Sequence, residues 1–260
     1  MIKKLINKSI FIIYIFSSTH AQAIEAIHVM KKNQESPIPI MSSSNISFEI
    51  VRFKGDKEKR KTRSFFRFEK NYNSNQIIKK TLIRFESPKS IKGTGLLSWL
   101  KRDNTTTQWL FLPRLKISKK IKSKDQSKSF MGTDFIFEDL SPLNINDYVF
   151  NFSEKSYVNE KLCYVINCLP KANSSYYKKV YFIDVQNFQA CKIIFYDSKE
   201  DIDKILYVYG IYKKEEYWSP KQLKMEKENG NYTLMNIKFF NPNAMLHDSL
   251  FTESYLEKLN

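Results

Sequence analysis

The chain has 260 residues, 42% of them apolar and 15% aromatic, which is enough to bury a sizeable core and excludes wholesale disorder. Only 6 glycines argue against glycine-rich phosphate-binding folds, and 3 cysteines are too few for a disulfide-built scaffold. A formal net charge of +16 favours anionic partners such as nucleic acid, phospholipid head groups or acidic polymers.

Residues 1–23 have the pattern of a secretory signal peptide. Three lysines precede the apolar run Ile10–Phe16, which is shorter than the roughly 20 residues needed to span a bilayer. The segment Ala21–Ala23 then supplies a small-x-small cleavage site. We expect cleavage after Ala23 and a soluble, exported domain over residues 24–260; the alternative is an uncleaved N-terminal anchor. An exported cationic protein meets anionic membrane surfaces and rarely nucleic acid, so we expect no nucleic-acid partner.

The first predicted elements are one helix and three strands. Residues 24–36 favour a short amphipathic helix, with Ile24, Ile27 and Met30 on one face and Pro37 at its end. The period then becomes two, which is typical of half-buried antiparallel strands. The alternating apolar positions are Ile46, Phe48 and Ile50, then Phe66 and Phe68, then Ile83 and Phe85.

The next strands lead to a basic segment. Leu96–Leu100 reads as a strand, and in the following run from Trp109 to Ile117 the apolar residues share one parity. Pro113 within that run implies an edge position or a bulge. The segment Arg114–Lys124 carries six basic side chains. It is either a solvated edge protected from aggregation by lysine or a site attracted to anionic lipid.

The second half of the chain also consists mainly of predicted strands. Asn229-Gly230 indicates a hairpin, and residues 249–259 favour a helix capped by Ser249. Together the elements predict a mainly β protein with one large antiparallel sheet of about ten strands, curled on itself, and short helices packed on it. The candidate strands are Lys161–Leu169, Tyr176–Val185, Phe188–Asp197, Lys204–Tyr212, Gln222–Lys227 and Tyr232–Phe240.

If the curled sheet does not close, its concave face is an apolar trough that helices could cover. The inward side chains would then line either a packed core or a cavity for an apolar ligand, and the sequence leaves both open. The candidate lining residues are Ile46, Phe48, Ile50, Phe66, Phe68, Ile83, Phe85, Trp109 and Phe111.

The search for catalytic chemistry predicts no enzyme, metal site or cofactor. His28 and His247 lie far apart in sequence without a neighbouring ligand set, and no G-x-S-x-G motif is present. Gly93-Thr94-Gly95 reads as a tight turn because the rest of a phosphate-binding loop is missing. Asp134, Glu138 and Asp139 form an acidic cluster that could do acid–base work, but a structural role in a turn or in ion pairs is favoured.

The three cysteines leave two alternatives. Cys163 and Cys168 fall on opposite faces of one predicted strand and cannot bridge each other there. Either could pair with Cys191 on a neighbouring strand, or all three are buried free thiols.

A series of ordered motifs resembles a known family. Phe85–Pro88 and Gly93–Leu97 precede Gln108–Pro113 (QWLFLP), and Ser129–Leu140 (SFMGTDFIFEDL) follows. These motifs resemble the bacterial outer-membrane lipoprotein-sorting protein family, which is similar in fold to the periplasmic lipoprotein carrier LolA, and the likeness spans nearly all of residues 24–260. The resemblance implies structural roles for Gly93, Gly95, Pro113, Phe130, Met131, Gly132, Asp134, Phe135, Glu138 and Asp139.

The resemblance also implies a fold and a function. The fold is an unclosed β-barrel whose apolar cavity is covered by helices. The function is a non-enzymatic periplasmic carrier that binds lipid or lipoprotein acyl chains and moves them toward the outer membrane, near an anionic membrane surface. The alternative is a sensor or accessory module that docks on an inner-membrane transporter of the resistance-nodulation-division type.

Overall fold

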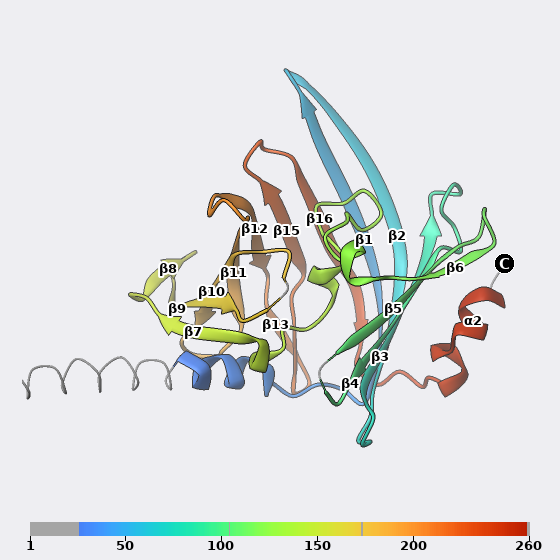
Figure 1. Cartoon of the computed structure of the whole chain (residues 1–260), viewed down its shortest axis with the longest axis horizontal. Coiled ribbons are helices and arrows are strands. Elements are labelled where there is room, and N and C mark those ends of the chain that lie inside the picture. The colour runs from blue at the N-terminus through green and yellow to red at the C-terminus, as the bar shows by residue number, and fades with distance from the viewer. Residues whose placement is uncertain (1–25, 104, 173, 259–260) are drawn as a thin grey trace, which may run out of the picture. The chain divides into compact units, whose positions relative to one another are not determined.

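The computed structural model describes residues 26–103, 105–172 and 174–258 (Figure 1). The predicted signal peptide, residues 1–23, lies outside them. The predicted fold class is confirmed: the protein is mainly β, and 14 of its strands belong to one antiparallel sheet that is not closed into a barrel. Among the described helices, none is long and apolar enough to cross a membrane.

The chain divides into two compact units. The first unit combines Met1–Ser36 with Asn144–Ile202, and the second combines Pro37–Leu143 with Asp203–Asn260. Because the first unit is inserted between two halves of the second, each unit is built from segments that are distant in sequence.

The first unit is a small antiparallel sheet with a helix over residues 26–34. Its strands have the order β11-β10-β9-β7, and β8 pairs with the beginning of β9. The helix joins the β10–β11 turn, where the Asn33 side chain donates to the Phe188 carbonyl over 2.7 Å. The elements are η3 (Ile145–Asp147), β7 (Tyr148–Phe152), β8 (Ser156–Val158), β9 (Lys161–Pro170), β10 (Lys178–Asp184) and β11 (Ala190–Tyr196).

The three cysteines of the first unit are buried free thiols. Cys163 and Cys191 lie on β9 and β11, which are not neighbours because β10 runs between them. No disulfide joins them, although their thiols are close enough to interact. Burial raises the pKa of the Cys163 thiol to about 12, and the adjacent Cys191 adds to this effect.

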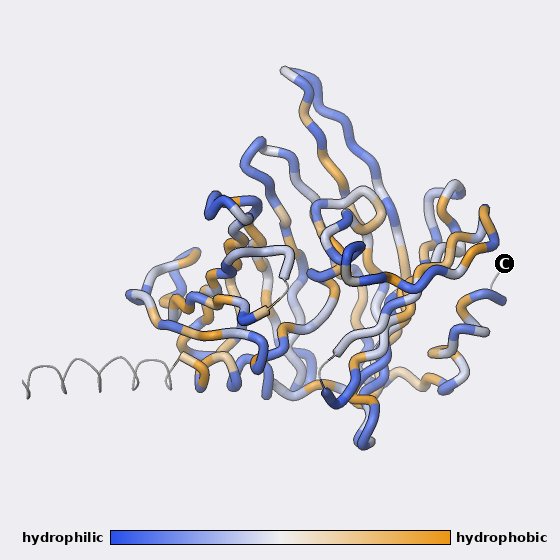
Figure 2. The backbone as a smooth tube through the Cα atoms, in the orientation of Figure 1, coloured by the Kyte–Doolittle hydropathy of each residue, from blue (hydrophilic) through white to orange (hydrophobic). Residues whose placement is uncertain are grey.

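The second unit contains the larger part of the sheet. Its strands have the order β6-β5-β4-β3-β2-β1-β16-β15-β12, and β13 and β14 form a separate hairpin. In the outer part of the long β1–β2 hairpin, the β2 arm is hydrophilic, whereas hydrophobic and hydrophilic residues alternate along the β1 arm (Figure 2). The strands are β1 (Met41–Lys54), β2 (Lys57–Asn71), β3 (Ile77–Ser87), β4 (Gly95–Lys101), β5 (Thr106–Leu112), β6 (Ile117–Lys120), β12 (Ile202–Tyr209), β13 (Tyr212–Lys214), β14 (Tyr217–Ser219), β15 (Gln222–Lys227) and β16 (Tyr232–Asn241).

The run from Trp109 to Ile117 is not one strand. β5 ends at Leu112, and residues 113–116 turn the chain into β6. Pro113 has no N–H to offer the sheet, and Lys116 has a φ of 51°, a left-handed conformation outside the strand range. As a result Leu115 and Ile117 are 63% and 49% exposed instead of joining the buried parity.

The predicted C-terminal helix is two short helices, η4 (Asp248–Phe251) and α2 (Glu253–Lys258). Thr252 between them is extended, and its hydroxyl accepts a hydrogen bond from the Tyr255 N–H over 3.2 Å. The cap of η4 is His247, whose ring nitrogen accepts from the Ser249 N–H. Ser249 is therefore inside the first helix and not its cap.

Both faces of the second unit's sheet are buried in part. The helix face consists of Leu82, Leu97, Trp109 and Phe111, which pack against Phe251 of η4 and Leu256 of α2. Gly95 belongs to this contact, because an added Cβ would lie 2.5 Å from Leu256 Cδ1. The cavity face, on the other side, carries Ile46, Phe48, Phe65 and Ile83.

Candidate functional site

The segment of residues 129–140, called the motif segment, lies on the cavity face. The Phe130 ring lies 5.8 Å from the ring of Phe85 and 6.4 Å from that of Phe48. The Phe135 ring lies 5.8 Å from that of Phe48. Because Phe130 and Phe135 are both buried, the aromatic residues of the motif form part of the core on this face.

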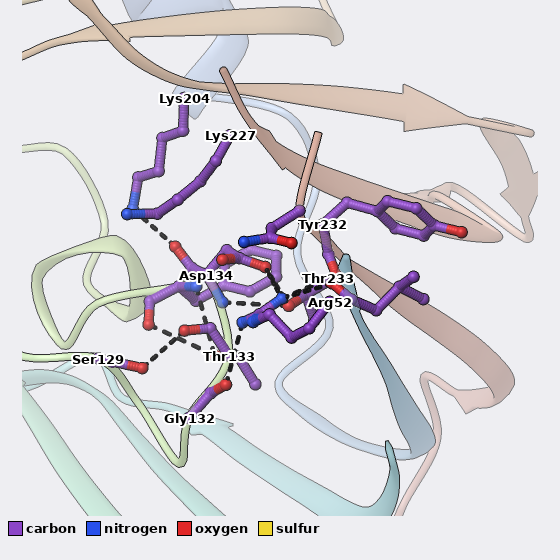
Figure 3. Close-up of polar contacts among 12 residues, drawn as sticks. Arg52, Ser129, Gly132, Thr133, Asp134, Lys204, Lys227, Tyr232 and Thr233 are labelled. Carbon is purple, nitrogen blue, oxygen red and sulfur yellow. Dashed lines mark hydrogen bonds and ion pairs between the residues drawn. The ribbon is translucent and has the colours of Figure 1, made fainter. Parts of the chain in front are cut away.

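Asp134 ties the motif segment to two central strands (Figure 3). Its carboxylate oxygen Oδ2 accepts hydrogen bonds from Arg52 Nη1 on β1 over 2.9 Å and from Thr233 Oγ1 on β16 over 2.6 Å. The Asp134 N–H in turn donates to Thr233 Oγ1 over 3.0 Å. These bonds give the buried carboxylate the partners that a buried charge requires.

A buried lysine makes a second attachment. Lys204 on β12 is 1% exposed, and its ammonium donates to Asp139 Oδ2 over 2.7 Å and to the Asp134 carbonyl over 2.9 Å. The same Asp139 oxygen accepts from the Ile136 N–H over 2.8 Å. The acidic residues of the motif therefore join the segment to β1, β16 and β12.

The turn at the start of the motif segment needs left-handed backbone. Met131 and Gly132 have φ values of 52° and 72°, and glycine adopts this conformation without strain. Thr133 Oγ1 donates to the Phe130 carbonyl over 2.6 Å, and Ser129 Oγ donates to the Thr133 carbonyl over 2.6 Å. The segment ends in the single turn η2 (Glu138–Leu140).

A cavity of about 310 Å³ lies between the motif segment and the sheet of the second unit. Its volume is at the lower end of the range of about 300 to 1,000 Å³ for ligand pockets. The sheet contributes an apolar wall, and Phe135, Leu140 and Pro142 contribute from the motif segment and the residues after it. The apolar wall consists of Ile46, Phe48, Phe65, Ile83, Leu100, Leu206, Leu223 and Met235.

Another part of the same sheet face is polar. Arg67, Glu69 and Lys79 line it, together with Thr81, Ser98 and Thr106. Burial alone would raise the pKa of Glu69. The charges of Arg67 and Lys79, with hydrogen bonds from Lys79 and Thr81, outweigh that effect and hold the pKa at about 2. Glu69 is therefore ionised at neutral pH.

The structure separates the predicted lining residues between the two faces. Ile46, Phe48 and Ile83 line the cavity. Ile50 and Phe85 share its face but are packed into the core. Phe66 and Phe68 point to the opposite side from Phe65, and Trp109 and Phe111 belong to the helix face under the C-terminal helices.

The remaining predicted motif residues occupy turns and contacts. Gly93 has a φ of 80° and donates to the Phe85 carbonyl, and Pro113 opens the β5–β6 turn. The sequence did not suggest Leu206, Leu223, Met235, Arg67 or Glu69 as lining residues. The three apolar ones lie in strands that the sequence predicted, but no face was assigned to them and their strand neighbours could not be read from local patterns.

No metal centre emerges from the geometry. Within residues 26–103, 105–172 and 174–258, no group of three or more histidine, cysteine, aspartate or glutamate side chains is arranged to hold a metal ion.

Comparisons with known proteins identify the fold. A family model described only as "-like: Uncharacterized protein" matches residues 78–258, and no curated protein sequence matches the chain. A domain assigned to outer membrane lipoprotein-sorting proteins, from Vibrio parahaemolyticus, has a TM-score of 0.83 at 24% identity, covering 91% of this chain and 100% of its own.

Two further crystal structures have the same fold. A DUF1329 family protein from Desulfovibrio piger has a TM-score of 0.82 at 22% identity, over 90% of this chain and 99% of its own. A LolA superfamily protein from Nitrosomonas europaea has a TM-score of 0.68 at 17% identity, over 88% of this chain and 98% of its own. At these identities the likeness establishes the fold alone.

Proposed function

Because the chain belongs to the family whose model spans residues 78–258 and has the fold of lipoprotein-sorting proteins, we propose that it is a periplasmic carrier. It binds lipid or lipoprotein acyl chains in the cavity of the second unit and moves them toward the outer membrane. The role is non-enzymatic, because holding and releasing a hydrocarbon chain needs no nucleophile or metal.

The cavity carries this proposal. Moving an acyl chain out of water is favourable by about 0.8 kcal/mol for each CH₂. The apolar wall, which includes Ile46 and Met235, can bury such a chain without directional contacts. The flexible thioether of Met235 adapts to chains of different shape. Release to a membrane is possible because a bilayer offers the same hydrocarbon environment.

The tip of the β5–β6 hairpin supports work at an anionic membrane. Leu115 and Ile117 are exposed there, and Figure 2 shows both hydrophobic and hydrophilic residues at this tip. Each basic side chain near an anionic surface adds about 1 kcal/mol of attraction. The exposed basic residues around the two aliphatic ones are Arg114, Lys116, Lys119, Lys120, Lys122 and Lys124.

Native mass spectrometry of the protein purified from the periplasm tests the carrier role. We expect bound lipid, and we expect delipidated protein to extract lipid from vesicles. Leu223→Trp places a large side chain in the cavity and should abolish both. Leu234→Trp is the matched control, because Leu234 lies beside Met235 on β16 and points to the other face.

The alternative is a sensor or accessory module that docks on an inner-membrane transporter of the resistance-nodulation-division type. Exposed apolar side chains near one end of the β1–β16 pair favour it: Ile40 is 71%, Phe239 55% and Met245 96% exposed. Stable capture of such a transporter by protein that never contains or extracts lipid would replace the carrier proposal with this one.

A further inference from the structure

The polar wall of the cavity carries an excess of positive charge. Glu69 on β2 lies between two cations: Lys79 Nζ is 2.5 Å from Glu69 Oε1, and Arg67 Nε is 3.5 Å from Glu69 Oε2. Glu69 is ionised, so one carboxylate faces two cations. The three side chains together leave one positive charge at the cavity wall.

The other charged group lining the cavity does not cancel this charge. The Asp139 carboxylate also lines the cavity, but it is paired at 2.7 Å with the buried ammonium of Lys204. That pair is neutral. The excess positive charge therefore stays with Arg67 and Lys79, on the same sheet face as the apolar wall and next to it.

Arg67 also has a donor to offer. Its Nε is shielded from solvent and has no hydrogen-bond partner among the described residues, since 3.5 Å to a Glu69 oxygen with poor alignment is too long. A guanidinium carries five N–H donors in a fixed plane that matches a carboxylate or a phosphate. A carboxylate or phosphate oxygen that reaches the terminal N–H groups of this guanidinium from the cavity would form charge-assisted hydrogen bonds with them.

The geometry points to an acidic amphiphile as the ligand of this cavity: a single hydrocarbon chain lying on the wall of Ile46, Leu223 and Met235, with an anionic carboxylate or phosphate head at Arg67 and Lys79. This inference rests on the proposed carrier function and narrows its cargo. A volume of about 310 Å³ suits one chain, and charge-assisted hydrogen bonds to the head are roughly twice as strong as neutral ones.

Calorimetric titration of the delipidated full chain with three ligands of equal chain length tests the inference. Dodecanoate and dodecyl phosphate should each bind at least about tenfold more tightly than dodecanol. The tighter of the two anions identifies the head as carboxylate or phosphate. Equal binding of all three overturns the acidic head and leaves the carrier function standing. Binding of none overturns the carrier function itself.

Two variants locate the head. Lys79→Met and Arg67→Met should remove most of the preference for the anions while the affinity for dodecanol is kept, which also shows that the variants are folded. Lys80→Met is the matched control, because Lys80 points to the opposite face of β3, where its ammonium lies 4.5 Å from the centre of the Trp99 ring. Full preference in both cavity variants, or its loss in the control, would contradict the assignment.

Discussion

The two faces of the second unit's sheet are built from the same strands but are covered in different ways. On the helix face, Phe251 and Leu256 fill the space above Leu82, Leu97 and Trp109. On the cavity face, the motif segment is held by ion pairs near Asp134 and Asp139, and a cavity of about 310 Å³ remains beside it. Apolar side chains therefore fill the helix face, whereas ion pairs hold the motif segment over the cavity face and leave a cavity beside it.

The difference shows how one sheet can be densely packed on one face and keep a cavity on the other. The helix face is filled with apolar side chains, and such dense packing stabilises the fold. A molecule in the cavity on the other face would leave that packing unchanged. Attaching the other cover by charged hydrogen bonds fixes its position without filling the space beneath it. The following predictions separate these two modes of cover, beginning with the largest expected effect.

Removing the buried ammonium of Lys204 should have the largest effect on the cavity face. Lys204→Met leaves the Asp139 carboxylate buried without its partner, and breaking such a pair costs about 3 to 5 kcal/mol of unfolding free energy. Urea denaturation measures it. Lys227→Met is the control, because its ion pair with Asp203 is long and exposed and should change stability by less than about 1 kcal/mol. An equal loss of unfolding free energy in the two variants would show that the buried pair of Lys204 and Asp139 matters no more for stability than an exposed pair.

Truncation on the helix face should follow. Leu256 is fully buried against Leu97 and Trp109, so Leu256→Ala should cost about 2 to 5 kcal/mol in the same denaturation experiment. Because the cavity lies on the other face, the variant should still extract lipid from vesicles under conditions where it is folded. A folded variant without lipid binding would show that the two faces are not independent.

Acid should weaken the polar wall of the cavity. The folded pKa of Glu69, about 2, lies below its ordinary value of 4.5, so its contribution is fully present above about pH 4.5 and is lost as the pH falls toward 2. That contribution is at most about 3 kcal/mol. Unfolding free energies of the wild type and Glu69→Gln should differ at pH 6 and converge near pH 2, as measured by denaturation across that range. A difference in unfolding free energy that stays constant from pH 6 to pH 2 would show that it does not come from the ionisation of Glu69.

Adding volume should distinguish the faces with the smallest effect. Leu97→Phe overfills the helix face and should cost about 1 to 3 kcal/mol. Leu206→Phe places the same extra volume toward the cavity and should cost less, or stabilise the protein by filling the void. Thermal unfolding of both variants makes the comparison, and a larger cost for Leu206→Phe would show that the cavity is not open to a larger side chain.

Much of the strand content could be predicted from local patterns. Alternation located the strands from Ile46 to Phe85, and Asn229-Gly230 placed the β15–β16 hairpin where it is found. The short strands β7 and β8 escaped prediction because they are only 5 and 3 residues long. Pro113 was expected to mark an edge position or a bulge within one run, but residues 113–116 form a turn that includes the left-handed Lys116.

The faces were harder to predict than the strands. The sequence Phe65-Phe66-Arg67-Phe68 offers phenylalanine at both parities. The continuous register of β2 with β1 places Phe65 opposite Ile46, so Phe65 and Arg67 face the cavity and Phe66 faces the other way. Long-range pairing was beyond local patterns too. β1 pairs with β16, so Leu223 and Met235 complete a wall begun by Ile46. Sequence separation of nearly two hundred residues leaves no local trace of that pairing.

That pairing of β1 with β16 has a consequence for biogenesis. A chain that is synthesised from its N-terminus contains β1 long before β16, the strand with which β1 pairs. Contacts between such distant segments form slowly, because a long loop must close before they are made. The apolar wall of the cavity can therefore be completed only after β15 and β16, which carry Leu223 and Met235, have been synthesised.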